Sequence, residues 1–370
     1  MNKVLSTNRN INLDLLRSTI MFFIVIWHSI VHGLNIASNS NQIILDFVSE
    51  TSIFNFWSTK LLMYATSIGV NCFILITGYF MIDYNKSIWP RFIKIWGKTS
   101  FYSLLFSFIF YICDSTEYGI GGVIFTAFPI YNGEYWFVSK YLALILLTPF
   151  LIKISKNITQ KEYFIGIIIL SIITINIPPI LNYGNIYSGP NNLLFFINLF
   201  FIGGYISKFS HQFNSNKIGT LFYLLILLFP TYDLLHELYK NEHYQSITSL
   251  NINSSLSNNS ITFILSLLFF LYFKNKKIKK NKISNFIANI TPYTFAVYLI
   301  HDNDEIRIFL WKNLNLIQYY DSNSFIIILL GFSLLIFSVC IFIDYLRNKI
   351  FKLLHIENIT NKILDKVDKK

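Results

Sequence analysis

Ten long apolar segments limit what this chain can fold into. A helix needs about 20 apolar residues to cross a bilayer, and runs of about that length recur along the whole sequence. The runs span residues 11–34, 61–82, 97–113, 136–152, 162–181, 191–207, 218–236, 259–273, 286–301 and 324–346. The runs at 97–113 and 286–301 are short, so we expect them to be tilted, broken or to end inside a cavity. The pattern predicts an all-α integral membrane protein, a bundle of about ten transmembrane helices.

The distribution of charge supports this prediction and gives an orientation. Only 13% of the 370 residues are charged, about half the share found in soluble proteins. The net charge is +11, and 24 of the 30 lysine and arginine residues lie in alternate connecting segments. This bias is the positive-inside rule rather than a sign of nucleic-acid binding. We therefore expect a multi-pass protein in contact with the lipid bilayer, located in the inner (plasma) membrane, with both termini cytoplasmic.

No soluble domain is predicted. We interpret residues 1–370 as a single polytopic membrane domain that ends in a basic cytoplasmic tail at 347–370. The longest outer loops are expected at 35–60, 114–135, 237–258 and 302–323.

Ionisable residues inside the first run are the strongest functional signal, because charges inside a span are costly and usually mark a site. Asp14 and Arg17 are three residues apart on one helical face and can pair. Arg17 and His28 also share a face, separated by a rise of ~16 Å. This arrangement suits a long anionic ligand that enters from the cytoplasmic side with its reactive end at His28. The alternatives are a salt bridge at the helix start and a histidine in an ordinary interhelical contact.

The spacing of His28 and His32 allows both rings to contact one metal ion. No further ligand cluster is evident in the sequence, and the three cysteines are far apart within apolar runs. We predict no metal.

Three further stretches carry candidate residues. Arg91 and Lys94 lie one turn apart in a basic, aromatic segment, which suits either membrane-surface anchoring or phosphate binding. Trp136 lies at the outer interface, where an aromatic belt is the simpler interpretation. Tyr298 and His301 end the ninth run at the outer face, and a solvated helix end is the simpler interpretation there.

Four stretches, in order, resemble the acyltransferase family 3 membrane enzymes. They are DLLRSTIMFFIVIWH at 14–28, GVNCFILITGYF at 69–80, YWFVSKYLALILLTPFL at 135–151 and VYLIH at 297–301. The first holds an arginine, ten residues and a histidine, as the family does. The chain is most similar to the stand-alone branch that acylates surface polysaccharides and has no C-terminal esterase-like domain. It departs from the family at Lys94, where a second arginine is common, and lysine lacks the planar fork.

The resemblance implies an O-acyltransferase that uses acyl-CoA, commonly acetyl-CoA, as the donor substrate, with a hydroxyl of a capsular or other surface polysaccharide, or of its lipid-linked precursor, as the acceptor. His28 would be the catalytic base, with Arg17 and Asp14 as its catalytic partners. Arg17, Arg91 and Lys94 would bind the donor, and Trp136, Tyr298 and His301 would shape the acceptor side. Direct transfer and an acyl-His28 intermediate both remain open.

Two other classes of function stay as alternatives. A secondary transporter would also carry intramembrane charges, but we find no repeated halves of the kind such proteins show. A flippase for glycan or lipid intermediates is the nearer rival, and it would consume no acyl-CoA. The oligomeric state is not readable from the sequence.

Overall fold

The computed structural model describes residues 10–34, 42–45, 50–113, 120–126, 128, 135–177, 192–210, 212–244, 248–251 and 260–356. Its helices are α1 (Ile11–Val31), α3 (Glu50–Thr66), α4 (Gly69–Met81), α5 (Trp89–Ile112), α6 (Ile120–Phe125), α8 (Trp136–Lys156), α9 (Gln160–Ser171), α11 (Leu193–Phe209), α12 (Ser215–Tyr244), α13 (Ser260–Asn275), α14 (Lys282–Ile290), α15 (Thr294–His301), α16 (Asp304–Leu314) and α17 (Phe325–Leu353). A π-helical turn (Ile172–Asn176) follows α9, and 3-10 turns occur at Thr291–Tyr293 and Leu316–Tyr319. Two short strands, β1 (Gln42–Leu45) and β2 (Thr248–Asn251), complete the set.

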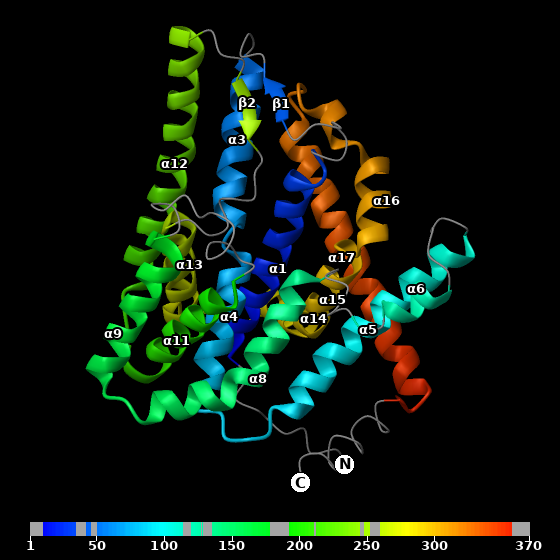
Figure 1. Cartoon of the computed structure of the whole chain (residues 1–370). Helices are drawn as coiled ribbons and strands as arrows, with labels where there is room; N and C mark the ends of the chain where they lie inside the picture. Colours follow the sequence, from blue (N-terminus) through cyan, green and yellow to red (C-terminus); the bar gives the residue numbers. More distant parts are fainter. Residues whose placement is uncertain are drawn as a thin grey trace.

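Helix α1 runs through the middle of the bundle (Figure 1). It packs against α3, α4, α13, α14, α15 and α17. Its start is fixed by Asn10, whose side chain accepts hydrogen bonds from the first-turn amides of Asn12 and Leu13. Because α1 is enclosed by other helices, its polar side chains meet protein partners rather than lipid. The start of α1 and the end of α17 lie at the same end of the bundle in Figure 1.

Six helical segments of the described chain are long and apolar enough to cross a membrane. They are Ile11–Val31, Ile53–Met81, Trp136–Lys156, Ser215–Tyr239, Lys282–His301 and Phe325–Leu353, and two shorter apolar helices span Leu193–Phe209 and Ser260–Asn275. These eight coincide with eight of the predicted runs. The other two runs, 97–113 and 162–181, fall on α5 and on α9 with its π turn. A helical membrane bundle is therefore confirmed, while the count of ten crossings and the cytoplasmic termini stay predictions.

Two of these spans are interrupted. The segment predicted at 61–82 is divided between α3 and α4, with the break at Ser67 and Ile68. The segment predicted at 286–301 is broken by the 3-10 turn between α14 and α15, which contains Pro292. Proline lacks an amide donor and its ring clashes with the preceding turn, so this break is expected. At this break the hydroxyls of Thr291 and Thr294 donate to the carbonyl oxygens of Ile287 and Thr291, respectively.

Glycines allow the close contact of α4 with α11. A Cβ at Gly78 would lie 2.1 Å from the carbonyl oxygen of Phe200, and one at Gly203 would lie 2.2 Å from that of Leu75. The backbones touch directly, which is the usual device for tight helix packing in membranes.

The predicted outer loops contain more regular structure than the sequence suggested. Helix α3 begins at Glu50, well inside the loop predicted at 35–60, because Asn55 is buried and donates to the carbonyl oxygens of Tyr320 and Ser322 (2.5 and 3.0 Å). The loop predicted at 302–323 holds α16 and a 3-10 turn.

Strands β1 and β2 form a small antiparallel ladder that the prediction of an all-α protein missed. Gln42 pairs with Asn251 and Leu45 with Thr248. Most of the loop predicted at 114–135, and residues 357–370 of the predicted basic tail, lie outside the described residues.

Candidate active site

Helix α1 holds Asp14, Arg17 and His28 on one face, as the sequence predicted. Arg17 donates from Nη1 to Oδ1 of Asp14 over 3.2 Å, and the Asp14 side chain is 5% exposed against 33% for Arg17. The guanidinium also lies over the ring of Phe80 at 5.2 Å. Asp14 therefore holds Arg17 in place, and the arginine remains accessible to a ligand.

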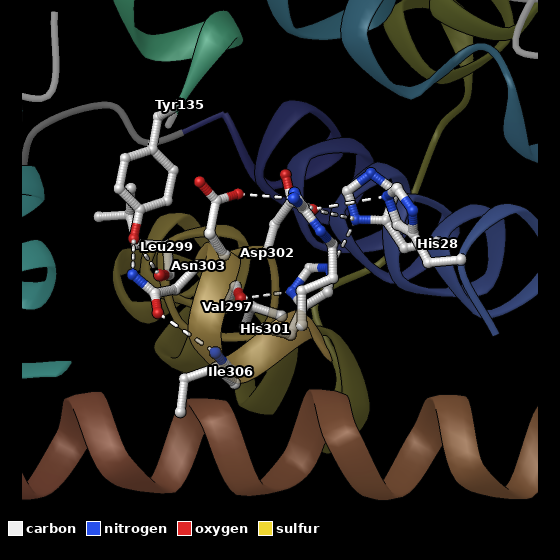
Figure 2. A network of polar contacts seen from close by, with 11 residues as sticks. His28, Tyr135, Val297, Leu299, His301, Asp302, Asn303 and Ile306 are labelled. Atoms are coloured by element: carbon white, nitrogen blue, oxygen red, sulfur yellow. Dashed lines mark hydrogen bonds and ion pairs between the residues drawn. The ribbon is translucent and has the colours of Figure 1, made fainter. Parts of the chain in front are cut away.

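The imidazole of His28 meets His301 at the junction of α1 and α15. Nδ1 of His28 lies 2.9 Å from Nε2 of His301, and Nδ1 of His301 lies 2.5 Å from the carbonyl oxygen of Val297. Figure 2 shows the two contacts in series. A carbonyl oxygen only accepts, so His301 carries its proton on Nδ1 when neutral, and its Nε2 must then accept. His28 consequently donates from Nδ1, which leaves the Nε2 lone pair of His28 available.

The sequence assigned His301 to the acceptor side, and the structure places it against His28 itself. His301 is 1% exposed, so the interpretation of a solvated helix end is wrong for this residue. His301 ends α15, which is separated from α14 by the 3-10 turn at Thr291–Tyr293. This break changes the path of the chain before His301, and the residue is buried as a result. A sequence pattern without three-dimensional neighbours gives no sign of this pairing.

Asp302 is a further buried group that the sequence did not single out. It is 3% exposed, and its Oδ1 lies 3.5 Å from Nδ1 of His28 and 3.7 Å from Nε2 of His32. His28, His32 and Asp302 thus bring three donor atoms within 4.8 Å of one another, an arrangement that could hold a metal ion. The sequence feature that could have pointed to Asp302 is its position directly after His301.

Arg307 on α16 balances this carboxylate. Its Nη1 lies 3.4 Å from Oδ1 of Asp302, and its Nη2 lies 2.5 Å from Oδ1 of Asp304. Burial lowers the pKa of Arg307, but the two carboxylates raise it by more, so the pKa lies above its usual value. The guanidinium therefore stays charged at the outer edge of the histidine cluster.

Aromatic side chains line the same junction. Tyr298 lies 6.5 Å from His28 between ring centroids, and it packs edge-on against Phe137 and Tyr135, each at 5.8 Å. Trp136, the residue chosen from the sequence, is half-buried and contacts Phe137 at 6.1 Å. Tyr135 and Phe137, which flank Trp136 in the sequence, are therefore the residues that pack against Tyr298.

Tyr135 ties α8 to the site. Its hydroxyl donates to the carbonyl oxygen of Leu299 (2.8 Å) and accepts from Nδ2 of Asn303 (3.2 Å) (Figure 2). Asn303 in turn accepts from the amide of Ile306 and caps α16. These contacts fix the segment that carries His301 and Asp302 from both sides.

Arg17 and His28 lie at two levels along α1, and rings from α8 and α15 form a row between them. Tyr141 stacks on Phe137, with centroids 5.5 Å apart and an angle of 12° between the rings, and Phe137 packs on Tyr298. Tyr141 interacts electrostatically with Arg17, and its hydroxyl lies 3.0 Å from Oγ1 of Thr77. The i, i+4 spacing of Phe137 and Tyr141 was the only signal in the sequence.

The two basic residues predicted on α5 are placed differently. Arg91 interacts electrostatically with Arg17, and its guanidinium contacts the Met81 sulfur. Lys94, one turn later, is exposed. The structure therefore brings Arg91 towards Arg17 and leaves Lys94 at the surface.

The bundle and its buried polar junction define a membrane protein with an internal polar site along α1. A family model described as an acyltransferase domain matches residues 10–353. The chain belongs to acyltransferase family 3 and is a membrane acyltransferase. Neither the curated proteins nor the solved structures give a match to it.

Proposed function

We propose that this protein transfers an acyl group, acetyl in the first instance, from acyl-CoA on the cytoplasmic side to a hydroxyl of a surface polysaccharide or its lipid-linked precursor. The observation that carries the proposal is the chain of contacts from His28 through His301 to Val297. It gives a base with a defined tautomer at one level of α1, while Arg17 supplies a cation at the other level.

His28 acts as the general base in this proposal. A sugar hydroxyl is a poor nucleophile near neutral pH and needs a base within hydrogen-bond reach. Nε2 of His28 takes the hydroxyl proton as the oxygen forms its bond to the thioester carbonyl carbon. The carbon–sulfur bond then breaks, and the imidazolium returns the proton to the CoA thiolate. His301 accepts from Nδ1 throughout, which favours the imidazolium that forms on His28.

The donor would lie along the face of α1. Arg17 and Arg91 would bind its phosphate groups, with Asp14 orienting Arg17 and Lys94 adding charge at the surface. The rings of Tyr141, Phe137 and Tyr298 provide an apolar wall between the two levels. Trp136 and Tyr298 would border the acceptor. With both termini cytoplasmic, Arg17 faces the donor side of the inner (plasma) membrane and His28 the acceptor side.

The test uses membranes that hold the wild-type protein, His28→Ala or, as a matched control, His236→Ala on α12. Each receives acetyl-labelled acetyl-CoA, and the label on surface polysaccharide is counted. We expect label with wild type and with His236→Ala, and a loss of roughly two to four orders of magnitude with His28→Ala at equal protein level. Wild-type transfer by His28→Ala would refute the assignment of the base. Glycan movement without consumption of acetyl-CoA would instead support the flippase.

A further inference from the structure

His28 and His32 share a face of α1 with a carboxylate opposite them. Oδ1 of Asp302 lies 3.5 Å from Nδ1 of His28 and 3.7 Å from Nε2 of His32. Around a tetrahedral zinc ion with ligand bonds of about 2.0–2.2 Å, neighbouring ligand atoms lie about 3.3 Å apart. Both separations exceed that value by only a few tenths of an ångström, and all three ligand atoms lie within 4.8 Å of one another. Rotation of the two imidazole rings would therefore bring the three atoms onto one ion.

The chemistry of the donor atoms selects the kind of ion. Two imidazole nitrogens and one carboxylate oxygen suit Zn²⁺, whereas Ca²⁺ and Mg²⁺ prefer oxygen ligands alone. Nε2 of His301, which already faces His28, or a water molecule can complete a fourth position. The His32 side chain is 28% exposed against 12% for His28 and 4% for Asp302, so an ion reaches the cluster past His32.

Arg307 is the charge that opposes an ion here. It shares Oδ1 of Asp302 with the two histidines, at 3.4 Å. It also holds Asp304 at 2.5 Å, and that contact survives when Asp302 turns towards an ion. A metal ion and Arg307 therefore compete for the carboxylate of Asp302. When the ion binds Asp302, Arg307 keeps Asp304 as its counter-charge.

We propose that His28, His32 and Asp302 form a binding site for Zn²⁺, or a similar divalent transition-metal ion, that inhibits acyl transfer. The inhibition rests on the proposed function, whereas the binding does not. A neutral imidazole that binds metal through Nδ1 carries its proton on Nε2. Zinc on Nδ1 of His28 thus removes the Nε2 lone pair that would take the hydroxyl proton, and it displaces the hydrogen bond to His301.

The binding experiment uses purified full-length protein in detergent, with Zn²⁺ binding measured by competition against a chelating dye. The variant is His32→Gln, and the matched control is His236→Gln, an exposed histidine on α12. We expect one tightly held ion per chain for wild type and control, and an affinity at least about tenfold lower for His32→Gln. Arg307→Gln should bind more tightly than wild type, because the competing charge is gone. Absence of binding by wild type, or equal binding by wild type and His32→Gln, overturns the site.

The activity experiment measures acetyl transfer by the same preparations with and without Zn²⁺. Zinc should inhibit wild type and His236→Gln and be reversed by EDTA, while His32→Gln keeps its basal transfer at the same zinc concentration. Unchanged wild-type transfer at full zinc occupancy overturns the inhibition. If no preparation transfers acetyl groups even without zinc, the proposed function fails, and the binding experiment still decides the metal site.

Discussion

The two ends of the α1 face are built differently. At His28 the partner ring is held in place, since His301 contacts a backbone carbonyl and the following segment is anchored by Tyr135 and Asn303. At Arg17 one buried carboxylate orients a side chain that stays 33% exposed. A rigid, desolvated junction suits chemistry, because the reacting groups need no reorganisation. An open cation suits recognition of a mobile anionic ligand. From this difference we propose transfer at the level of His28 and donor binding at the level of Arg17.

Apart from variants of His28 itself, the largest effect is expected from His301→Ala. Removing the acceptor for Nδ1 of His28 loses a hydrogen bond to a group that becomes charged, about 1.5–3 kcal/mol, or roughly 10- to 150-fold in kcat. The KM for acetyl-CoA should stay near its wild-type value. His301→Gln, whose amide oxygen can accept the same proton, should recover part of kcat. Steady-state kinetics on purified protein measure both constants. A rise in KM with unchanged kcat would mean that His301 and His28 serve donor binding rather than transfer.

Arg17→Lys should give the opposite pattern. The charge stays, but the planar fork that can hold Asp14 and a phosphate together is lost. We expect the KM for acetyl-CoA to rise roughly tenfold, equivalent to about 1.4 kcal/mol, with a small change in kcat. A fall in kcat alone would mean that Arg17 acts on the reacting atoms.

A smaller effect separates the two basic residues of α5. Arg91→Gln removes a charge close to Arg17, and we expect the KM for acetyl-CoA to rise up to about fivefold, the range of partly exposed ion pairs. Lys94→Gln is the matched control, because Lys94 is exposed one turn away and should change KM less than about twofold. Equal effects would show that overall positive charge, and no defined contact, attracts the donor.

The smallest effect on transfer is expected from changes in the contact between α4 and α11. Gly78→Ala drives a methyl group into the backbone of α11, which should lower stability by about 1–3 kcal/mol. Gly331→Ala on α17 meets no atom within 4 Å and is the control. Thermal unfolding in detergent measures both. Equal melting temperatures for Gly78→Ala and Gly331→Ala would show that the α4–α11 contact does not stabilise this part of the bundle.

The sequence predicted most of the scaffold and half of the site. Length and hydropathy locate α1, α8, α12 and α17, because a bilayer demands long apolar helices. Residues on one helix, such as Asp14, Arg17 and His28, could be grouped from helical periodicity alone. The pairing of His28 with His301 and Asp302 could not, because those residues lie more than 270 positions apart and meet through a broken helix. The early start of α3 was missed for a similar reason, since Nδ2 of Asn55 donates to the carbonyl oxygens of Tyr320 and Ser322, more than 260 positions away.

The separation of donor binding from chemistry is tested most directly by His28→Gln. Purified wild-type and His28→Gln proteins would be compared for equilibrium binding of acetyl-CoA and for acetyl transfer in the same preparations. We expect donor affinity within about twofold of wild type, together with a loss of transfer of roughly two to four orders of magnitude. Loss of acetyl-CoA binding in His28→Gln, or transfer at the wild-type rate, would contradict this separation.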